Sequence, residues 1–237
     1  MRIKIATLNF WGLPWPFSVD KKKRLEMLVL FIKRNKLDII CLQEIWLNRD
    51  FKYLCFKLSE YYSFKPKNFI FNSSGLVIFS KFKLSDSEFY PFNFLFKNFE
   101  LSRKGFILLK VKIKNKIFKI INTHLYHHQN IFGEKTREKQ INLIRKNLDN
   151  SPTFILGDFN TINNNWSINK FKIISKKDEP TFSLKNKYVH RGIMKFFNNS
   201  DLYCDLILSN SKFRVIKKKI YKTEISDHYF ISSEIEL

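Results

Sequence analysis

The chain has 237 residues, of which 44% are hydrophobic and 27% charged, and its formal net charge is +22. This composition excludes a disordered or membrane-spanning protein, and the length fits one domain over residues 1–237 with an ample core. The three cysteines, Cys41, Cys55 and Cys204, form no close pair and show no Cys/His ligand spacing. The sequence therefore indicates neither a disulfide framework nor a zinc site.

The positive charge has two competing explanations. It would attract polyanions, either nucleic acid or an anionic lipid surface. However, the chain is rich in Lys, Asn, Ile and Phe and poor in Ala, Gly and Pro, which an AT-rich coding sequence would produce regardless of function. Charge alone therefore does not select a partner.

The start of the chain does not resemble a secretory signal, because residues 2–10 alternate as a strand does. The longest clean apolar run, residues 27–32, is too short to cross a bilayer. We expect a cytoplasmic protein by default, with peripheral membrane contact as an alternative, no transmembrane segment and no obligate protein partner.

The periodicity of apolar residues predicts a mixed α and β protein. One helix is expected over residues 21–35, with Asp20 as its N-cap, and another over residues 135–148. Short β-rich runs predict strands at residues 3–8, 39–43, 75–80, 105–113, 118–123, 153–157 and 204–209.

Polar side chains recur at or just beyond the C-terminal ends of the predicted strands. They are Asn9, Glu44, His124, Asp158, Asn160, Asp227 and His228. Each is a weak signal alone, because a Glu after a strand is usually solvated and Gly-Asp-x-Asn is a common turn. Strand ends can nevertheless bring distant residues to one cleft.

The order of these elements along the chain resembles the endonuclease/exonuclease/phosphatase superfamily, which contains deoxyribonuclease I and the neutral sphingomyelinases. The matching motifs are Thr-Leu-Asn at residues 7–9, Leu-Gln-Glu at 42–44, Ser-Gly-Leu at 74–76, Asn-Thr-His-Leu at 122–125, Gly-Asp-Phe-Asn at 157–160 and Ser-Asp-His at 226–228. The resemblance implies a four-layer α/β sandwich, in which two mostly antiparallel sheets pack face to face between helices.

The resemblance also implies a role for each residue. Glu44 would be the principal ligand of Mg²⁺, or of Mn²⁺ in its place, with Asn9 and Asp227 beside it. Carboxylate and amide oxygens suit such hard cations. His228 would be the general base, and its ordinary pKa near 6.5 suits that task.

Further members of the family's centre map onto this sequence in the same way. Asp205 would orient His228, although an unrelated turn is the alternative for this residue. Asp158, Asn160 and His124 would act on the phosphoryl group or the nucleophile. Asn122, and Lys104 in Ser-Arg-Lys-Gly-Phe at residues 102–106, are expected to bind substrate, with Asn122 also a candidate for holding neighbouring groups in place.

The loop after Asn9 favours one substrate class. Leu-Asn-Phe-Trp-Gly-Leu-Pro at residues 8–14 resembles the first element of neutral sphingomyelinases, which implies hydrolysis of a membrane phospholipid with release of phosphocholine. Two aromatic segments, residues 11–17 and 89–99, could contact a membrane. For Phe92, Phe94 and Phe96 the alternation favours ordinary core packing.

The main alternative is an endonuclease acting on DNA or RNA. Lysine-rich residues 21–24, 110–119 and 217–222 could contact the phosphate backbone, although lysines in the second stretch fit a solvated strand face equally well. A catalytically silent binding module is a third reading, and it is disfavoured because every catalytic position is filled.

Overall fold

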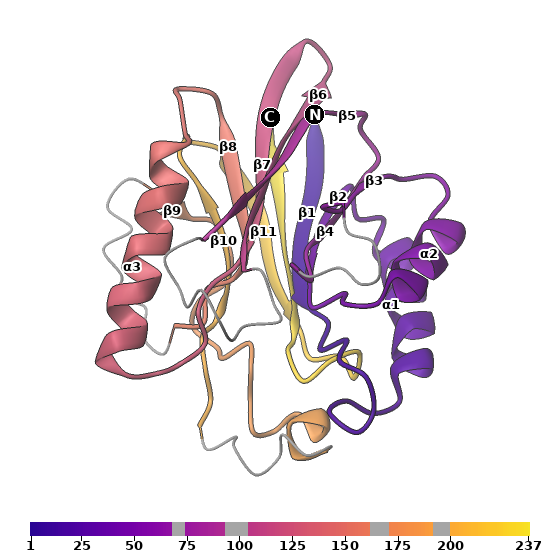
Figure 1. Ribbon diagram of the computed structural model, residues 1–237. Coiled ribbons are helices and arrows are strands. Elements are labelled where there is room, and N and C mark those ends of the chain that lie inside the picture. The colour runs from indigo at the N-terminus through magenta and orange to yellow at the C-terminus, as the bar shows by residue number, and fades with distance from the viewer. Residues whose placement is uncertain (68–73, 93–103, 162–170, 192–199) are drawn as a thin grey trace.

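In the computed structural model the chain forms two six-stranded β-sheets packed face to face (Figure 1). The structure describes residues 1–67, 74–92, 104–161, 171–191 and 200–237. The first sheet has the order β11-β12-β1-β2-β4-β3 and the second β5-β6-β7-β8-β10-β9. Within the described residues, β1 with β2 and β7 with β8 are the parallel pairs, and the other pairs are antiparallel.

The strands of the first sheet are β1 (Arg2–Asn9), β2 (Ile39–Gln43), β3 (Tyr62–Phe64), β4 (Val77–Ser80), β11 (Arg214–Tyr221) and β12 (Phe230–Glu236). Those of the second are β5 (Leu84–Pro91), β6 (Gly105–Ile113), β7 (Lys116–His124), β8 (Thr153–Asp158), β9 (Lys172–Ile173) and β10 (Asp205–Ser209). The helices are α1 (Lys21–Asn35), α2 (Asn48–Lys57), α3 (Ile131–Lys146) and the short 3-10 helix η1 (Lys187–His190).

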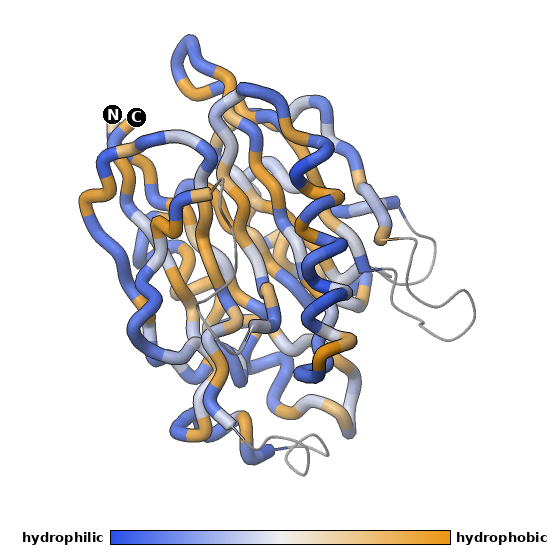
Figure 2. Tube along the Cα trace, turned by 90° about the vertical axis from the view of Figure 1, so that its left-hand side faces the viewer, coloured by the Kyte–Doolittle hydropathy of each residue, from blue (hydrophilic) through white to orange (hydrophobic). Residues whose placement is uncertain are grey.

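Three apolar clusters hold four layers together. Side chains such as Ile5, Ile107 and Leu156 fill the space between the sheets. Leu28 of α1 and Leu54 of α2 pack on the outer face of the first sheet, while α3 and its neighbours cover the outer face of the second. Figure 2 shows hydrophobic strands behind the largely hydrophilic turns of α3. The expected four-layer α/β sandwich is therefore confirmed.

Local sequence accounts for most of the predicted elements. The helix at residues 21–35 is observed with those bounds, and Leu25, Leu28, Val29 and Ile32 form its buried face. Asp20 occupies the N-cap position, but its side chain makes no capping hydrogen bond and instead pairs with Arg191. Asp20 is therefore the N-cap residue, as predicted, but its carboxylate pairs with Arg191 and does not cap the helix amides.

The third helix begins earlier than the sequence predicted. It starts at Ile131 rather than at residue 135, because the Asn130 side chain accepts a hydrogen bond of 2.8 Å from the Gly133 amide and caps the helix. Exposed Ile131 and Phe132 in the first turn obscured the amphipathic period.

Helix α2 and strands β3, β5, β9, β11 and β12 were not predicted. Among the described residues, no helix combines the length and apolarity needed to span a membrane.

Candidate active site at the edge of the two sheets

The sheet topology explains how the predicted residues meet. Asn9 and His124 end β1 and β7, Asp158 ends the parallel neighbour β8, and Glu44 follows β2. Asp205 instead begins β10, which is antiparallel to β8 and pairs with it at Asp158. The ends of β1, β2, β7 and β8 and the beginning of β10 therefore lie at one edge of the sandwich, opposite the chain termini (Figure 1).

The expectation that every site residue follows a strand is wrong for Asp227 and His228. They precede β12 and come after the turn that ends β11 at Tyr221. Because β12 runs antiparallel to β1, its start lies beside the end of β1. The two residues thus reach the shared edge from the opposite chain direction.

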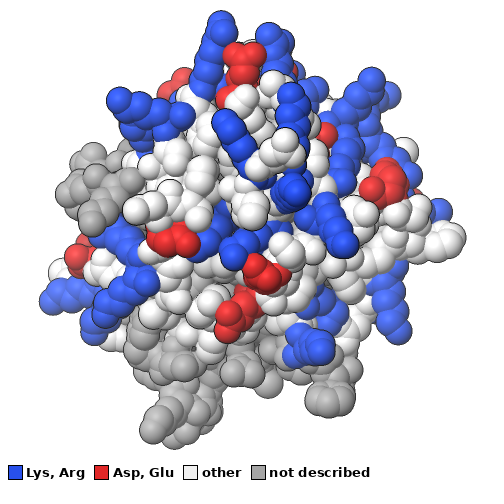
Figure 3. All heavy atoms as spheres, turned by 90° about the horizontal axis from the view of Figure 1, so that it is seen from above, with Lys and Arg blue, Asp and Glu red and all other residues white. Residues whose placement is uncertain are grey.

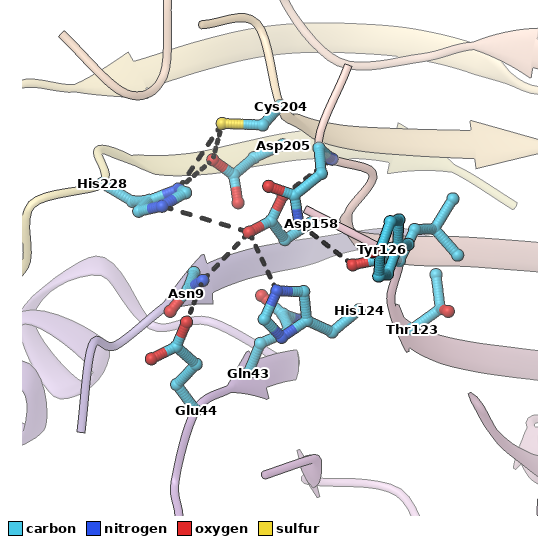
Figure 4. Close-up of polar contacts among 12 residues, drawn as sticks. Asn9, Gln43, Glu44, Thr123, His124, Tyr126, Asp158, Cys204, Asp205 and His228 are labelled. Atoms are coloured by element: carbon cyan, nitrogen blue, oxygen red, sulfur yellow. Dashed lines mark hydrogen bonds and ion pairs between the residues drawn. The ribbon is translucent and has the colours of Figure 1, made fainter. Parts of the chain in front are cut away.

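Asn9 bridges the two sheets. Its Nδ2 donates to Glu44 Oε1 at 3.0 Å and to Asp158 Oδ2 at 2.9 Å (Figure 4). Its Oδ1 accepts from the Trp11 amide at 3.0 Å, and this backbone donor fixes the orientation of the Asn9 amide. The amide nitrogen therefore faces Glu44 and Asp158, so Asn9 orients the two carboxylates. That Asn9 is also a metal ligand stays a prediction.

The loop after Asn9 holds Glu44 in place through Gly12. The Gly12 amide donates to the Glu44 carbonyl at 3.0 Å, and a Cβ on Gly12 would stand 2.1 Å from that oxygen. Only glycine permits this approach. Glu44 itself has a φ of 60°, a left-handed conformation that this contact supports.

His228 and Asp205 form a buried dyad. His228 Nδ1 lies 2.8 Å from Asp205 Oδ2, and Nε2 points toward Asp158 Oδ2 at 4.0 Å. Burial disfavours the charged ring, but attraction to Asp205 and Cys204 together with the hydrogen bonds to both residues outweighs it and holds the pKa of His228 well above 6.5. The Phe182 ring meets the imidazole edge-on at 5.2 Å. The geometry fixes which ring nitrogen faces the open site.

Asp158 is the central carboxylate. It is 1% exposed, and burial together with repulsion from Asp205 raises its pKa to about 6, against the attraction of His228. Its Oδ1 accepts from the Asn160 amide at 2.9 Å. His124 Nε2 lies 3.4 Å from Oδ2, and burial and the positive charge of Lys104 hold the pKa of His124 well below 6.5.

Asn160 and Lys104 converge on one backbone carbonyl. Lys104 Nζ donates to the Leu125 carbonyl at 2.7 Å, and Asn160 Nδ2 donates to the same oxygen at 3.1 Å. Leu125 follows His124 directly, so both side chains stand at the rim of the site. The structure thus brings Asn160 and Lys104 close to the predicted catalytic residue His124.

The donor set suits a hard divalent cation. The Glu44 carboxylate accepts hydrogen bonds from Asn9 and Trp46, and burial together with repulsion from Glu44 raises the pKa of Asp227. Carboxylates crowded in this way are stabilised by a bound cation. Within the described ranges, the group of closely spaced potential ligands is Cys204, Asp205 and His228, which is the dyad with a neighbouring thiol rather than the predicted ligand set.

Asn122 lies deeper than expected. It is fully buried between the sheets, where Nδ2 donates to the carbonyls of Leu42 and Val77 at 2.9 Å each and Oδ1 accepts from Gln43 Nε2 at 2.7 Å. Its polar atoms are engaged inside the protein. The expectation that Asn122 binds substrate is therefore wrong, and its position fits the alternative of holding neighbouring groups in place.

Arg24 is a structural residue that the sequence did not identify. It is fully buried, and its guanidinium donates to the carbonyls of Phe10, Trp11 and Ile225 at 2.6, 2.9 and 3.2 Å. It thereby ties the loop after Asn9 to the segment before Asp227. A contact between Arg24 and a nucleic-acid backbone is excluded. The signal available in the sequence was a single Arg on the apolar side of the first helix.

Other basic residues proposed as phosphate contacts are also engaged elsewhere. Lys21 pairs with Asp50 at 3.1 Å, and Lys119, 9% exposed, pairs with Asp149 at 2.8 Å. The β6–β7 hairpin that carries residues 110–119 turns at the end of the sandwich opposite His124. These lysines therefore do not line the site.

The aromatic segments are only partly available for a membrane. Trp11 is buried, whereas Trp15 is 82% and Phe17 45% exposed. Phe89 and Tyr90 belong to β5 and pack against core clusters, so they are not anchors. Phe92 is buried, as core packing requires. Residues 93–103, with Phe94, Phe96 and Phe99, lie outside the described residues.

Comparison with known proteins places this arrangement in context. The model of the Endonuclease/Exonuclease/phosphatase family matches residues 6–228. Sphingomyelin phosphodiesterase 2 of Homo sapiens is 30% identical over 62% of this chain and 34% of its own length. The protein of the same name from Rattus norvegicus is 28% identical over 60% and 33%. The chain thus spans about a third of the length of these relatives.

Two solved structures share the fold at low sequence identity. Sphingomyelinase C from Streptomyces griseocarneus superposes with a TM-score of 0.76 at 14% identity, covering 100% of both chains. D. rerio TDP2, complexed with single strand DNA product, gives a TM-score of 0.80 at 16% identity and covers 100% of this chain and 99% of its own. Both support the same sandwich.

Proposed function

Because the chain belongs to the Endonuclease/Exonuclease/phosphatase family, we propose that it is a divalent-metal-dependent phosphodiesterase in which His228 activates the attacking water. The observation that carries the proposal is the buried dyad: the 2.8 Å contact between Asp205 and His228 Nδ1 leaves Nε2 facing Asp158. A histidine oriented by a carboxylate is suited to general-base catalysis.

Glu44 and Asp227 are the residues that would hold the cation, with Asn9 fixing the Glu44 carboxylate. Mg²⁺ is the proposed ion and Mn²⁺ its substitute, because the oxygen donors suit hard cations. When bound, the cation would polarise the phosphoryl group and neutralise its charge. The raised pKa of Asp227 reflects burial and repulsion from Glu44, which a cation at this position would relieve.

The protein's own groups move the proton. Asp205 accepts a hydrogen bond from the Nδ1–H of His228, so the ring in its neutral form presents a lone pair at Nε2. Water attacks phosphorus while one of its protons passes to Nε2. The bond between phosphorus and the leaving oxygen breaks, and this oxygen keeps the electron pair and takes up a proton from solvent. Asp158, beside Nε2, would orient the water. The separation of 3.4 Å between His124 Nε2 and Asp158 Oδ2 is long for a hydrogen bond, so His124 could donate this N–H to a phosphoryl oxygen.

We propose a choline phospholipid, sphingomyelin, as the substrate. Support comes from the curated relatives named above and from the loop that follows Asn9, which presents Trp15 and Phe17 to solvent. Amphipathic aromatics favour the interfacial zone of a membrane. An endonuclease is the alternative, supported by the fold shared with D. rerio TDP2.

A paired substrate assay tests the proposal. With Mg²⁺ or Mn²⁺ the protein should hydrolyse an aryl phosphodiester and release phosphocholine from sphingomyelin vesicles, and chelation should abolish both. His228→Ala should lower both rates at least ~100-fold, whereas His190→Ala, at an exposed histidine, should preserve them. Degradation of plasmid or RNA with steep salt inhibition, and no phosphocholine release, would instead establish the nuclease alternative.

A further inference from the structure

A basic pocket lies on the outer face of the first sheet, away from the catalytic edge. It has a volume of about 340 Å³, and its lining includes Lys4, Arg34, Lys36, Lys217 and Lys219. Lys4 precedes Asn9 by five positions in β1, which places it about 16 Å along the strand from the site. Figure 3 shows the end of the molecule that carries the termini, with many Lys and Arg side chains and few acidic ones.

A bulge in the edge strand builds this pocket. The pairing of β11 with β12 shifts between Val215 and Lys217, so Val215 and Ile220 both face the space between the sheets although five positions separate them. The same shift places Lys217 and Lys219 on the opposite face, where α1 ends. Without the extra residue, the alternation of the strand would divide these side chains differently.

The lining of the pocket also includes the hydroxyl groups of Tyr221 and Ser232. Tyr221 packs edge-on against Phe31 of α1 at 4.9 Å, and its hydroxyl lies 3.4 Å from Ser232 Oγ. Lys4 Nζ is anchored at the end of α1, 3.4 Å from the Asn35 carbonyl. Two hydroxyl groups and ammonium groups therefore surround one concave space.

The charges of this pocket are not balanced by the protein. Five basic side chains line it together with one carboxylate, that of Glu234. In the part of the chain that the structure describes, none of these five cations makes an ion pair. Glu234 stands directly across from both Lys4 and Lys217. Like charges that line one small pocket repel each other unless an anion is present.

We propose that this pocket binds a compact polyvalent phosphate, at a site separate from the catalytic edge. Its volume is near the lower limit of small-molecule sites, which span roughly 300–1,000 Å³, so it suits a pyrophosphate or a phosphomonoester rather than an extended chain. Ammonium, guanidinium and hydroxyl donors on several sides match phosphate oxygens. The ligand could be free in solution or the headgroup of a lipid.

Calorimetric titration with inorganic pyrophosphate in metal-free buffer tests the site. The intact protein should bind one pyrophosphate, and Lys217→Gln/Lys219→Gln should weaken binding at least ~10-fold, since hydrogen bonds between charged groups are lost. Lys218→Gln is the matched control, because Lys218 lies between them on β11 but faces Ile173 of the other sheet. It should change the Kd less than about twofold, as expected for a charge that contributes only at a distance.

Three further measurements complete the test. Lys217→Arg/Lys219→Arg should retain binding, and none of these variants should change hydrolysis of a soluble aryl phosphodiester. Equal weakening by Lys218→Gln, or unchanged binding in the double Gln variant, would overturn the proposal. Vesicles containing phosphatidic acid distinguish the source of the ligand. If the ligand is a lipid headgroup, the intact protein sediments with the vesicles and the double Gln variant does not. If the ligand is a free phosphate, the double Gln variant loses pyrophosphate binding and neither protein sediments with the vesicles.

Discussion

Asp205 Oδ2 lies 2.8 Å from His228 Nδ1 in a site where both side chains are buried. The carboxylate fixes the ring tautomer and raises the pKa of His228. Asp205→Asn should therefore lower kcat/KM about 100-fold or more and also move the acidic limb of the pH–rate profile to lower pH. A purely structural role would reduce the rate without moving that limb. Asp178→Asn, at an exposed carboxylate, should leave the profile unchanged.

Arg24 joins the loop after Asn9 to the segment before Asp227. Arg24→Met removes donors from buried carbonyl oxygens and should lower the free energy of unfolding by about 3–5 kcal/mol. Activity should fall even where the variant is fully folded, because Glu44 and Asp227 lose their common support. Lys23→Met on the same helix is exposed and serves as the control. Equal stability of both variants in urea unfolding would contradict this role.

Asn122 stabilises the packing of one sheet on the other. Asn122→Ala removes one acceptor of the Gln43 amide and the side-chain donor to the carbonyls of Leu42 and Val77. We expect a loss of about 2–4 kcal/mol in the free energy of unfolding. Asn142→Ala, at an exposed position of α3, should change it by less than about 0.5 kcal/mol.

His124 makes stability depend on pH. Burial holds its pKa well below 6.5 in the folded protein, whereas the unfolded chain takes up a proton near pH 6.5. The unfolded state therefore binds more protons as pH falls below 6.5, and this histidine then destabilises the fold. In metal-free protein, His124→Gln should reduce the stability lost between pH 7.5 and 5.0 by up to about 2 kcal/mol. Denaturant titrations at the two pH values measure the difference, and an unchanged loss would contradict it.

Trp15 offers a test that separates the membrane from the chemistry. It is 82% exposed, so Trp15→Ala should leave folding and hydrolysis of a soluble aryl phosphodiester unchanged. Release of phosphocholine from vesicles should fall about 10-fold, because an interfacial contact worth 1–2 kcal/mol is lost. Phe56→Ala removes an aromatic that is 75% exposed on α2 and should not affect vesicle hydrolysis. Equal effects of the two changes would argue against the loop as a membrane contact.

Sequence patterns predicted what depends on local periodicity. The helix at Lys21–Asn35 and the strands β2 and β6 have the expected bounds, because each carries a regular apolar period. Strand β11 was not predicted, because its bulge breaks the alternation on which strand prediction depends. The order of the family's motifs predicted that Glu44 and His228 lie in one site. The contacts that hold each side chain there come from residues distant in sequence and could not be predicted.

The same limit applies to the candidate site. Asn9 was expected to lie beside the metal, but its hydrogen bond from the Trp11 amide could not be predicted, because no local pattern encodes such a contact. Arg24 resembles any basic residue near a helix start until its buried partners are known. Asn122 was expected beside catalytic groups, but its amide bonds Gln43 and the carbonyls of Leu42 and Val77, because the direction in which it points depends on how the sheets pack.

The hydrogen bond from Asn9 to Asp158 crosses from the first sheet to the second. Each sheet therefore carries only some of the proposed catalytic groups, with Glu44 and His228 on one side and His124, Asp158 and Asp205 on the other. A small sliding of one sheet over the other would separate the halves while every strand remained paired. The relative alignment of the two layers, more than the integrity of either, determines whether the groups can act together.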